Sequence, residues 1–227
     1  MKIAVLGTGM VGRAIADRLS TLGHDVAIGT RDVERTLAHT EGPPGIVSFA
    51  QWQQAHPAVQ LRTLADAAAQ GEVIVNATHG AASLNALEAT GAANLAGKVL
   101  LDIGNPLDVS QGMPPRLTVA NTDSLGEQIQ RAYPEARVVK SLNTMNAEIM
   151  IDPSRLPGYH NAFVSGEDAG AKETVMGLLR EFGWPDNAII DLGGIKTARA
   201  VEMYGELLFA VAAATGTFHF NVGIVRE

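Results

Sequence analysis

The sequence predicts an α/β protein: a Rossmann-type, doubly wound parallel sheet with a small C-terminal α/β extension that ends in a long buried helix. Short apolar runs alternate with amphipathic runs of helical spacing over the first 140 residues, as in a parallel sheet covered by helices. A glycine-rich turn follows the first apolar run. The last long apolar stretch, residues 197–214, is apolar on nearly every side, which is typical of a helix buried in a core or between subunits.

The elements of the first part follow one another without long interruptions. The predicted strands are short apolar runs at residues 3–6, 26–29, 59–61, 73–76, 99–103 and 136–140. The predicted helices have apolar residues at helical spacing and cover residues 10–22, 32–39, 63–70, 81–90 and 124–132. Residues 41–58 include Pro43 and Pro44, so we expect a loop followed by a short helix that contains Trp52.

The pattern changes after Lys140. A linking stretch over residues 141–158 comes first. It is followed by a strand, a helix, a strand and the long apolar helix, at residues 162–165, 169–182, 188–192 and 197–214. We therefore divide the chain into a Rossmann domain over residues 1–147 and a C-terminal portion over residues 148–227.

The composition excludes several classes of protein. With 227 residues, of which 46% are hydrophobic, the chain can bury a sizeable core. The net charge of −7 and the lack of a basic tract argue against nucleic-acid binding, which needs clustered Lys and Arg. No stretch approaches the roughly 20 apolar residues of a membrane span, and there is no Cys for disulfides or thiolate metal sites. We expect a cytoplasmic protein with no nucleic-acid or membrane partner.

The first turn contains glycines at Gly7, Gly9 and Gly12, between a buried strand and an amphipathic helix. In such a position Gly7 permits the tight turn, Gly9 lets the backbone approach a pyrophosphate, and Gly12 lets the helix pack closely on the strand. The N–H groups and the dipole at the start of a helix favour an anion. The sequence therefore predicts a dinucleotide site.

The end of the second strand indicates which dinucleotide binds. An acid at this place would accept hydrogen bonds from the adenosine ribose of NAD, but the strand ends Gly29-Thr30-Arg31. The hydroxyl of Thr30 and the guanidinium of Arg31 suit a 2′-phosphate, and Arg35 lies one helical turn further on. We therefore expect NADP(H). The alternative is that both arginines are solvated and that Asp32 is the ribose acid.

Polar or small residues follow three later strands, at the edge where ligands of open parallel sheets bind. The residues that we expect near the nicotinamide end are Asn76, Ala77, Thr78, His79, Gly104, Asn105 and Asn143. His79 is a candidate general acid, a cofactor or substrate contact, or an exposed bystander. Lys140, the second candidate for catalysis, is either a hydrogen-bonding group near the cofactor or a solvated lysine at a strand end.

The sequence contains no other acid–base set. It has no His-rich metal-ligand spacing, no GxSxG elbow and no Tyr-x-x-x-Lys pair, so no metal site is expected. An enzyme that moves hydride between two bound redox cofactors has mainly to position their rings, so this scarcity is compatible with such chemistry.

Four segments resemble the family of coenzyme F420-dependent NADP oxidoreductases, whose fold also resembles the cytosolic reductase domain of the STEAP metalloreductases. They are GTGMVG at 7–12, GTRD at 29–32, KSLNTMNAEIMIDP at 140–153 and FVSGEDAGAK at 163–172, and the resemblance spans essentially the whole chain. It implies hydride exchange between NADP(H) and a deazaflavin, coenzyme F420, beside the nicotinamide. Residues 1–147 then bind NADP, and residues 148–227 provide the acceptor site and dimer contacts.

The resemblance also assigns single residues. It places Thr8, Gly9, Met10 and Val11 at the pyrophosphate, and it places Thr30, Arg31 and Arg35 at the 2′-phosphate. The segment NATHGAAS at 76–83 departs from the apolar, proline-containing loop of the deazaflavin enzymes, which leaves the second substrate open. Residues that either close the acceptor site or simply pack are Met203, Leu207, Leu208, Phe209, Phe218, His219 and Phe220.

Three functions remain open on the sequence. The first is hydride transfer from NADPH to a deazaflavin or flavin-like acceptor. The second is reduction of a small carbonyl or imine compound with proton delivery by His79 or Lys140. The third is a non-catalytic NADPH-binding sensor. We expect a small-molecule redox acceptor and a homodimer.

Overall fold

The computed structural model describes residues 1–40 and 47–226. The strands of the central sheet are β1 (Lys2–Leu6), β2 (Asp25–Thr30), β3 (Gln60–Thr63), β4 (Val73–Asn76), β5 (Val99–Asp102), β8 (Arg137–Ser141), β9 (Ala162–Gly166) and β10 (Ile189–Asp191). In the described residues they form an eight-stranded sheet of order β10-β9-β8-β5-β4-β1-β2-β3. The part from β3 to β8 is parallel and has the Rossmann order, so the predicted fold is confirmed.

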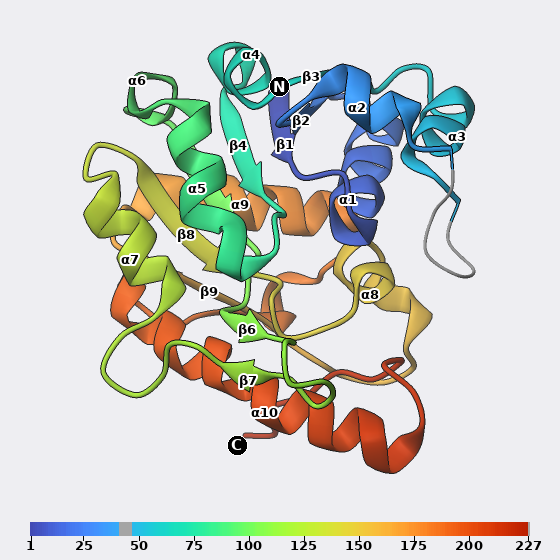
Figure 1. Ribbon diagram of the computed structural model, residues 1–227. Helices are drawn as coiled ribbons and strands as arrows, with labels where there is room; N and C mark the ends of the chain where they lie inside the picture. Colours follow the sequence, from blue (N-terminus) through green and yellow to red (C-terminus); the bar gives the residue numbers. More distant parts are fainter. Residues whose placement is uncertain (41–46, 227) are drawn as a thin grey trace.

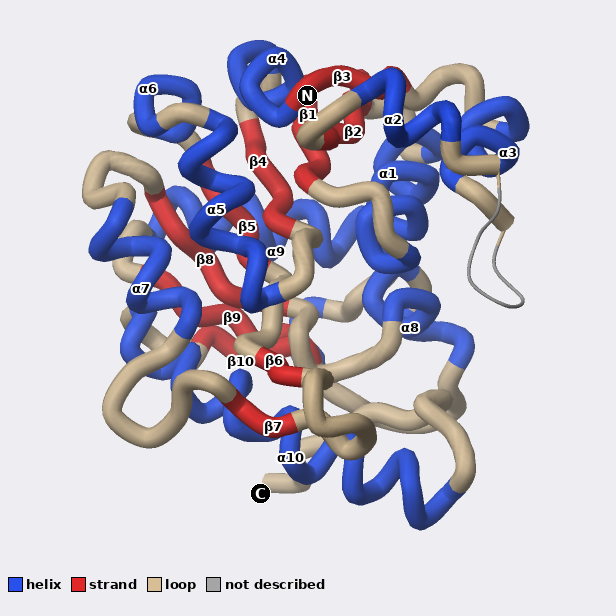
Figure 2. The backbone as a smooth tube through the Cα atoms, viewed as in Figure 1, coloured by secondary structure: helices blue, strands red, loops and turns tan. Residues whose placement is uncertain are grey.

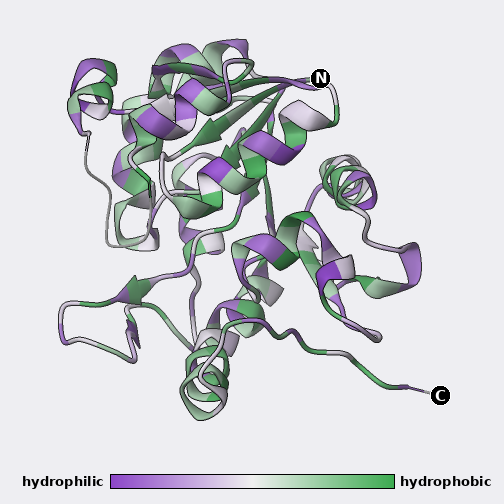
Figure 3. Cartoon of the chain, turned by 90° about the vertical axis from the view of Figure 1, so that its right-hand side faces the viewer, coloured by the Kyte–Doolittle hydropathy of each residue, from purple (hydrophilic) through white to green (hydrophobic). Residues whose placement is uncertain are grey.

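Helices cover both faces of this sheet (Figures 1 and 2). The helices packed in the core of one face are α1 (Met10–Thr21), α3 (Phe49–Ala55), α8 (Ala147–Ile151) and α9 (Ala169–Phe182). Those of the other face are α4 (Leu64–Gln70), α5 (Gly80–Thr90), α6 (Ala92–Leu95), α7 (Leu125–Ala132) and the start of α10 (Ala198–Thr215). The short α2 (Val33–Ala38) follows β2 and buries none of its residues. Figure 3 shows the hydrophobic residues concentrated on the central strands.

Apolar stripes at helical spacing position the longer helices. In α1 the buried residues Gly12, Ile15, Ala16 and Leu19 lie on one face, as expected for an amphipathic helix. Helix α9 buries a similar stripe and ends at Gly183, which adopts the left-handed conformation common at helix ends. Helix α3 contains Trp52 as predicted, whereas the expected loop at 41–46 lies outside the described residues.

The C-terminal strands extend the same sheet. β9 pairs with β8 in antiparallel orientation, and β10 runs parallel to β9, so the sheet is mixed rather than fully parallel. The expected linking stretch 141–158 contains α8 and the 3-10 turn η1 (Pro153–Arg155), which brings the chain back along β8 without a full crossover helix. The division of the chain at residue 147 stays a proposal.

Several short elements are not predicted by the sequence pattern. They are α6, α8, a hairpin of β6 (Leu107–Asp108) and β7 (Arg116–Leu117), and the 3-10 turns η1, η2 (Asp186–Ala188) and η3 (Ile195–Thr197). Runs of two to five residues are too short to establish a helical or strand period. The hairpin matters for the site because it follows β5 and packs against α10.

The long apolar helix α10 is buried on one face only. Its buried residues include Val201, Gly205 and Leu208, whereas Leu207 is 54% exposed. The outer face is therefore not buried within one chain, and burial between subunits, the other expected setting, stays a prediction. Across residues 1–40 and 47–226, no helix combines the length and hydropathy needed to cross a bilayer.

Candidate functional site

The glycine-rich turn joins β1 to α1 as predicted. Gly7 has a φ angle of 120°, and a Cβ on it would lie 2.7 Å from the carbonyl oxygen of Ala77. A Cβ on Gly12 would overlap the carbonyl oxygen of Gly7. Both residues therefore have to be glycine for α1 to begin directly on the turn, against the end of β4.

The start of α1 is open to a ligand. Gly9 is the extended N-cap residue, and no side chain in the described part of the chain caps this helix end. The first N–H groups of the helix, including those of Met10 and Val11, therefore have no partner within the helix. Together with the helix dipole they suit a phosphate or pyrophosphate group.

Arg13 fixes this turn, although the sequence pattern does not single it out. Its Nε donates to the carbonyl oxygen of Thr8 at 2.8 Å, and a terminal nitrogen donates to the carbonyl oxygen of Val47 at 2.7 Å. The guanidinium also lies over the ring of Phe49, 5.3 Å from its centroid. Burial lowers the pKa of Arg13 below its usual value. The glycine-rich turn is thus tied to the start of α3.

The end of β2 lies beside the turn, since Gly7 N–H donates to the carbonyl oxygen of Gly29. Asp32 accepts a hydrogen bond from the backbone N–H of Arg35 at 2.9 Å and so serves as the N-cap of α2. Arg31 and Arg35 are exposed, and neither guanidinium bonds to another described residue. The assignment of Arg31 and Arg35 to a 2′-phosphate, and its alternative with Asp32 as the ribose acid, both stay predictions. Thr30 shares a hydrogen bond with the hydroxyl of Thr36 at 2.8 Å.

The polar residues after β4 and β5 form one buried network. The Asn76 amide nitrogen donates to Asp102 Oδ1 at 2.8 Å and to Ser83 Oγ at 3.1 Å, while Asn76 Oδ1 accepts from the Thr78 hydroxyl at 2.6 Å. Asn76 is fully buried, so its amide supports the strand ends and is not presented at the surface. Asn76 holds the loop that contains Thr78, and its predicted place near the cofactor stays a prediction.

Asn105 and Asn143 bind each other across the ends of β5 and β8. The Asn105 amide nitrogen donates to the carbonyl oxygen of Asn143 at 2.7 Å, and the Asn143 amide nitrogen donates to Asn105 Oδ1 at 2.9 Å. Asn143 also donates to the carbonyl oxygen of Val201 in α10 at 3.0 Å. The structure therefore brings these two predicted residues together and joins them to the long helix.

His79 lies at the rim of this edge. It is exposed and precedes α5 as its N-cap residue, and its side chain makes no capping hydrogen bond there. Ala77, two residues before His79, is part-buried and lies against the glycine turn. A Cβ placed on Gly12 would lie 3.7 Å from its methyl group. The roles of His79 as acid, as contact or as bystander stay open.

Lys140 is fully buried, so its interpretation as a solvated strand-end lysine is wrong. Its ammonium group lies 2.5 Å from Asp102 Oδ2 and 2.8 Å from Glu202 Oε1, and it donates to the carbonyl oxygen of Gly104 at 2.5 Å. Burial alone would lower the pKa of Lys140, but the two carboxylates outweigh it and raise the pKa above its usual value. Burial raises the pKa of Glu202. Lys140 is thus a buried, fully hydrogen-bonded group at the end of β8, and its part in the chemistry stays a prediction.

Glu202, Ser83 and Asp102 belong to this site without being predicted for it. Asp102 ends a strand of buried apolar residues, and Glu202 lies on the buried, otherwise apolar stripe of α10. An acid in such a position is a signal that a buried cation faces it. The sequence pattern does not show which cation that is, because the partners lie tens of residues apart.

Some of the predicted acceptor residues of the C-terminus are buried or part-buried, and others are exposed. Leu208 is buried, and the Met203 sulfur accepts from the backbone N–H of Asn121. The rings of Phe209 and Phe218 meet edge to face with centroids 5.6 Å apart. His219 pairs with Glu148 of α8 at 3.0 Å, so the tail lies on the segment that follows β8. Phe220 is part-buried and Leu207 is exposed.

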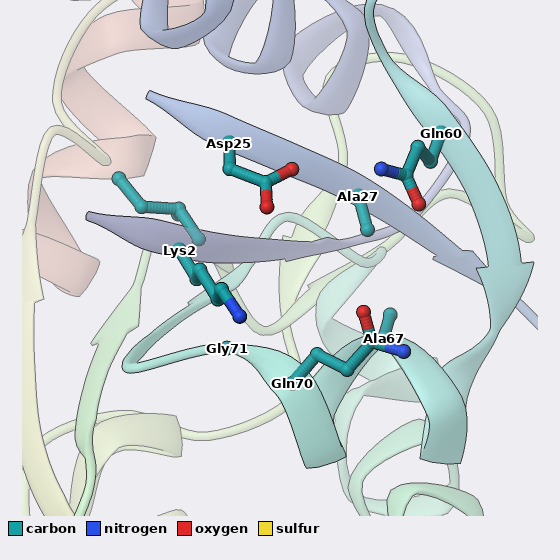
Figure 4. Close-up of a pocket in the computed structure, with 8 residues that line it drawn as sticks. Lys2, Asp25, Ala27, Gln60, Ala67, Gln70 and Gly71 are labelled. Carbon is teal, nitrogen blue, oxygen red and sulfur yellow. The ribbon is translucent and has the colours of Figure 1, made fainter. Parts of the chain in front are cut away.

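One cavity lies at the amino ends of the strands, opposite the predicted dinucleotide site, and is too small for a cofactor. It has a volume of about 10 Å³, and Figure 4 shows Lys2, Asp25, Gln60 and Gln70 around it, next to β1, β2 and α4. Such a volume holds about one water molecule. Ligands of open parallel sheets bind at the carboxyl ends of the strands, which in Figure 1 point toward β6, β7 and α10.

The Rossmann strand order and the uncapped start of α1, on a turn that requires glycine at two positions, define the class of a dinucleotide-binding α/β protein. Comparison with known proteins identifies the family. The family described as NADP oxidoreductase, coenzyme F420-dependent, matches residues 2–106. A crystal structure of a proposed F420-dependent NADP-reductase from Arthrobacter sp. FB24 is 57% identical, covers 100% of both chains and superposes with a TM-score of 0.95. The chain belongs to this family of NADP-dependent oxidoreductases.

Two curated relatives agree with this assignment. The F420-dependent NADP reductase of Methanothermobacter marburgensis is 28% identical over 212 residues, which cover 92% of this chain and 91% of that protein. The metalloreductase STEAP3 of Rattus norvegicus is 28% identical over 203 residues, or 88% of this chain. The chain spans only 36% of the length of STEAP3, so the likeness to that protein concerns one part of it.

Proposed function

We propose that this chain transfers hydride between NADPH and coenzyme F420, or a closely related deazaflavin or flavin-like acceptor. The uncapped start of α1, on a turn that admits no side chain at Gly7 or Gly12, is the observation that carries the proposal. Family membership supports the choice of NADP, and the names of two relatives support the choice of coenzyme F420.

The residues at the carboxyl ends of the parallel strands suit the successive groups of an NADPH molecule. The pyrophosphate would lie on the N–H groups of Met10 and Val11. Arg31 and Arg35 would bind the 2′-phosphate, since both are exposed at the end of β2 and carry permanent positive charge. A guanidinium can form two parallel, charge-assisted hydrogen bonds to a phosphate.

The nicotinamide end would lie over the loops that follow β4, β5 and β8. When bound, NADPH supplies the hydride that the acceptor receives. The protein contributes a fixed surface in which Thr78 is held by Asn76 and Asn105 is held by Asn143. Holding two rings at reacting distance is the principal demand of this transfer, and it needs rigid loops more than an acid.

A direct test is to mix the purified protein with NADPH and oxidised coenzyme F420 and to follow the absorbance of both. We expect saturable loss of both absorbances at equal rates, with much slower reduction of free flavin and no change when the acceptor is left out. Tight NADPH binding without any transfer to the deazaflavin would contradict the proposal and would favour another acceptor, such as a small carbonyl or imine compound, or a non-catalytic NADPH-binding sensor.

We extend the proposal to a homodimer and a cytoplasmic location. The outer face of α10 exposes Leu207 at 54%, next to exposed Ala210 and Ala214, and Phe218 of the tail is 42% exposed. A second copy of the chain would cover this apolar face. Light scattering at micromolar concentration is expected to give twice the monomer mass, and a monomer would contradict the dimer. Cell fractionation tests the location.

A further inference from the structure

A buried cluster of one cation and two acids joins three distant parts of the chain. Asp102 ends β5, Lys140 lies in β8 and Glu202 lies in α10, and the side chains of all three are at most 1% exposed. The ammonium group of Lys140 lies 2.5 Å from Asp102 and 2.8 Å from Glu202. We refer to these three residues as the buried cluster.

Every polar atom of the buried cluster has a partner. The three N–H bonds of Lys140 are matched by Asp102, Glu202 and the carbonyl oxygen of Gly104. Glu202 also accepts the backbone N–H groups of Leu125 at 2.7 Å and Gly126 at 3.0 Å. These are the first two residues of α7, so the start of that helix offsets the extra negative charge.

The buried cluster reaches the predicted nicotinamide surface through Gly104. The N–H group of Gly104 donates to Asp102 Oδ1 at 3.2 Å and its carbonyl oxygen accepts from Lys140, so both polar groups of this residue are held. The next residue, Asn105, pairs with Asn143, which also bonds to Val201, the neighbour of Glu202 in α10. One turn of α10 is therefore tied to the loops after β5 and β8 at two places.

We propose that Glu202, acting through Lys140, is a positioning residue that fixes the Gly104–Asn105 turn for hydride transfer. This inference rests on the proposed function for the identity of the reaction. Buried ion clusters add little net stability compared with apolar packing, because desolvation offsets their attraction. What the buried cluster adds is direction: each bond has a fixed partner and angle, and the chain of bonds ends at the turn under the nicotinamide.

The test compares Glu202→Gln with the matched control Glu206→Gln, an exposed acid one turn further along the same helix. For Glu202→Gln we expect kcat for coenzyme F420 reduction to fall about 10- to 100-fold, while the Kd for NADPH stays within about threefold of the original. The fluorescence spectrum of bound NADPH is expected to change as well, since the nicotinamide is no longer held in one position. The control should match the unaltered protein in all three measurements.

A second variant separates positioning from stability. Lys140→Met combined with Asp102→Asn and Glu202→Gln removes the cation and both acids together, so no unpaired charge stays buried. We expect this protein to melt close to the original temperature and yet to keep the same loss of kcat, because the bond to Gly104 is gone. Recovery of kcat together with stability would overturn the inference.

Two other results decide the matter. A folded Glu202→Gln protein with kcat and NADPH fluorescence like those of the original would overturn the positioning role. If the original protein reduces no deazaflavin, the proposed function fails, but the fluorescence comparison does not depend on the acceptor. A changed spectrum at unchanged NADPH affinity then still supports the positioning role, and an unchanged spectrum overturns it.

Discussion

The two ends of the carboxyl edge differ in how far apart in the chain their residues are. At the glycine turn the groups expected to bind the cofactor lie between Gly7 and Arg35, from the end of β1 to the short helix after β2. In the buried cluster they come from β5, β8 and α10, and Asp102 is a hundred residues from Glu202. The first region works through backbone shape and exposed charge, and the second through buried side chains. Substitutions should therefore affect ligand binding in the first region and stability or turnover in the second.

The largest effect on stability is expected for Lys140→Met alone. This change leaves two buried carboxylates without their cation, for which a loss of about 3–5 kcal/mol is typical. Urea unfolding measures it. The triple variant without the cation and both acids should regain most of the loss, and a single variant less than about 1 kcal/mol below the original would show that the buried cluster is not ionised as described.

In the region of the glycine turn, Arg31→Ala is expected to weaken NADPH binding without changing the stability of the fold. Loss of a charge-assisted contact to the 2′-phosphate should weaken NADPH binding about 10- to 100-fold, with NADH binding within about threefold of the original. Calorimetric titration with both cofactors measures the difference. The control is Arg180→Ala, a surface arginine of α9 whose partners are Glu173 and Asp186. An equal loss for NADPH and NADH would contradict the role of Arg31.

The same contrast explains what could be predicted from the sequence. The turn at Gly7, the alternation of strands and helices and the exposed arginine at the end of β2 follow from local patterns, because neighbouring residues determine them. The partner of Lys140 could not be predicted, since Glu202 meets it only after β9, α9 and β10 have been placed. The antiparallel pairing of β9 with β8 and the exposed face of α10 depend on tertiary contacts in the same way.

The smallest expected effect concerns an ion pair nearer the surface of α7, the helix whose start is held by Glu202. The hydrogen bond from Arg131 lowers the pKa of Asp123 to about 2, so the folded protein binds this proton more weakly than the unfolded chain. The stabilisation is complete above roughly pH 5 and is lost as the pH falls toward 2. Because Asp123 is 28% and Arg131 59% exposed, solvent screening limits it to roughly 1 kcal/mol.

Asp123→Asn measures this contribution. The free energy of unfolding of the variant should lie below that of the original at pH 7, and the difference should shrink steadily as the pH is lowered from 5 to 3. A difference that stays constant over this range would mean that the carboxylate charge is not the cause.

In the proposed reaction, hydride passes directly from NADPH to the deazaflavin on this protein. A single turnover with NADPH that carries deuterium at the transferred position, run in ordinary water with oxidised coenzyme F420, tests it by mass spectrometry of the reduced acceptor. We expect the reduced deazaflavin to contain one deuterium atom. A reduced acceptor that contains only solvent hydrogen, or no reduction at all, would contradict the account.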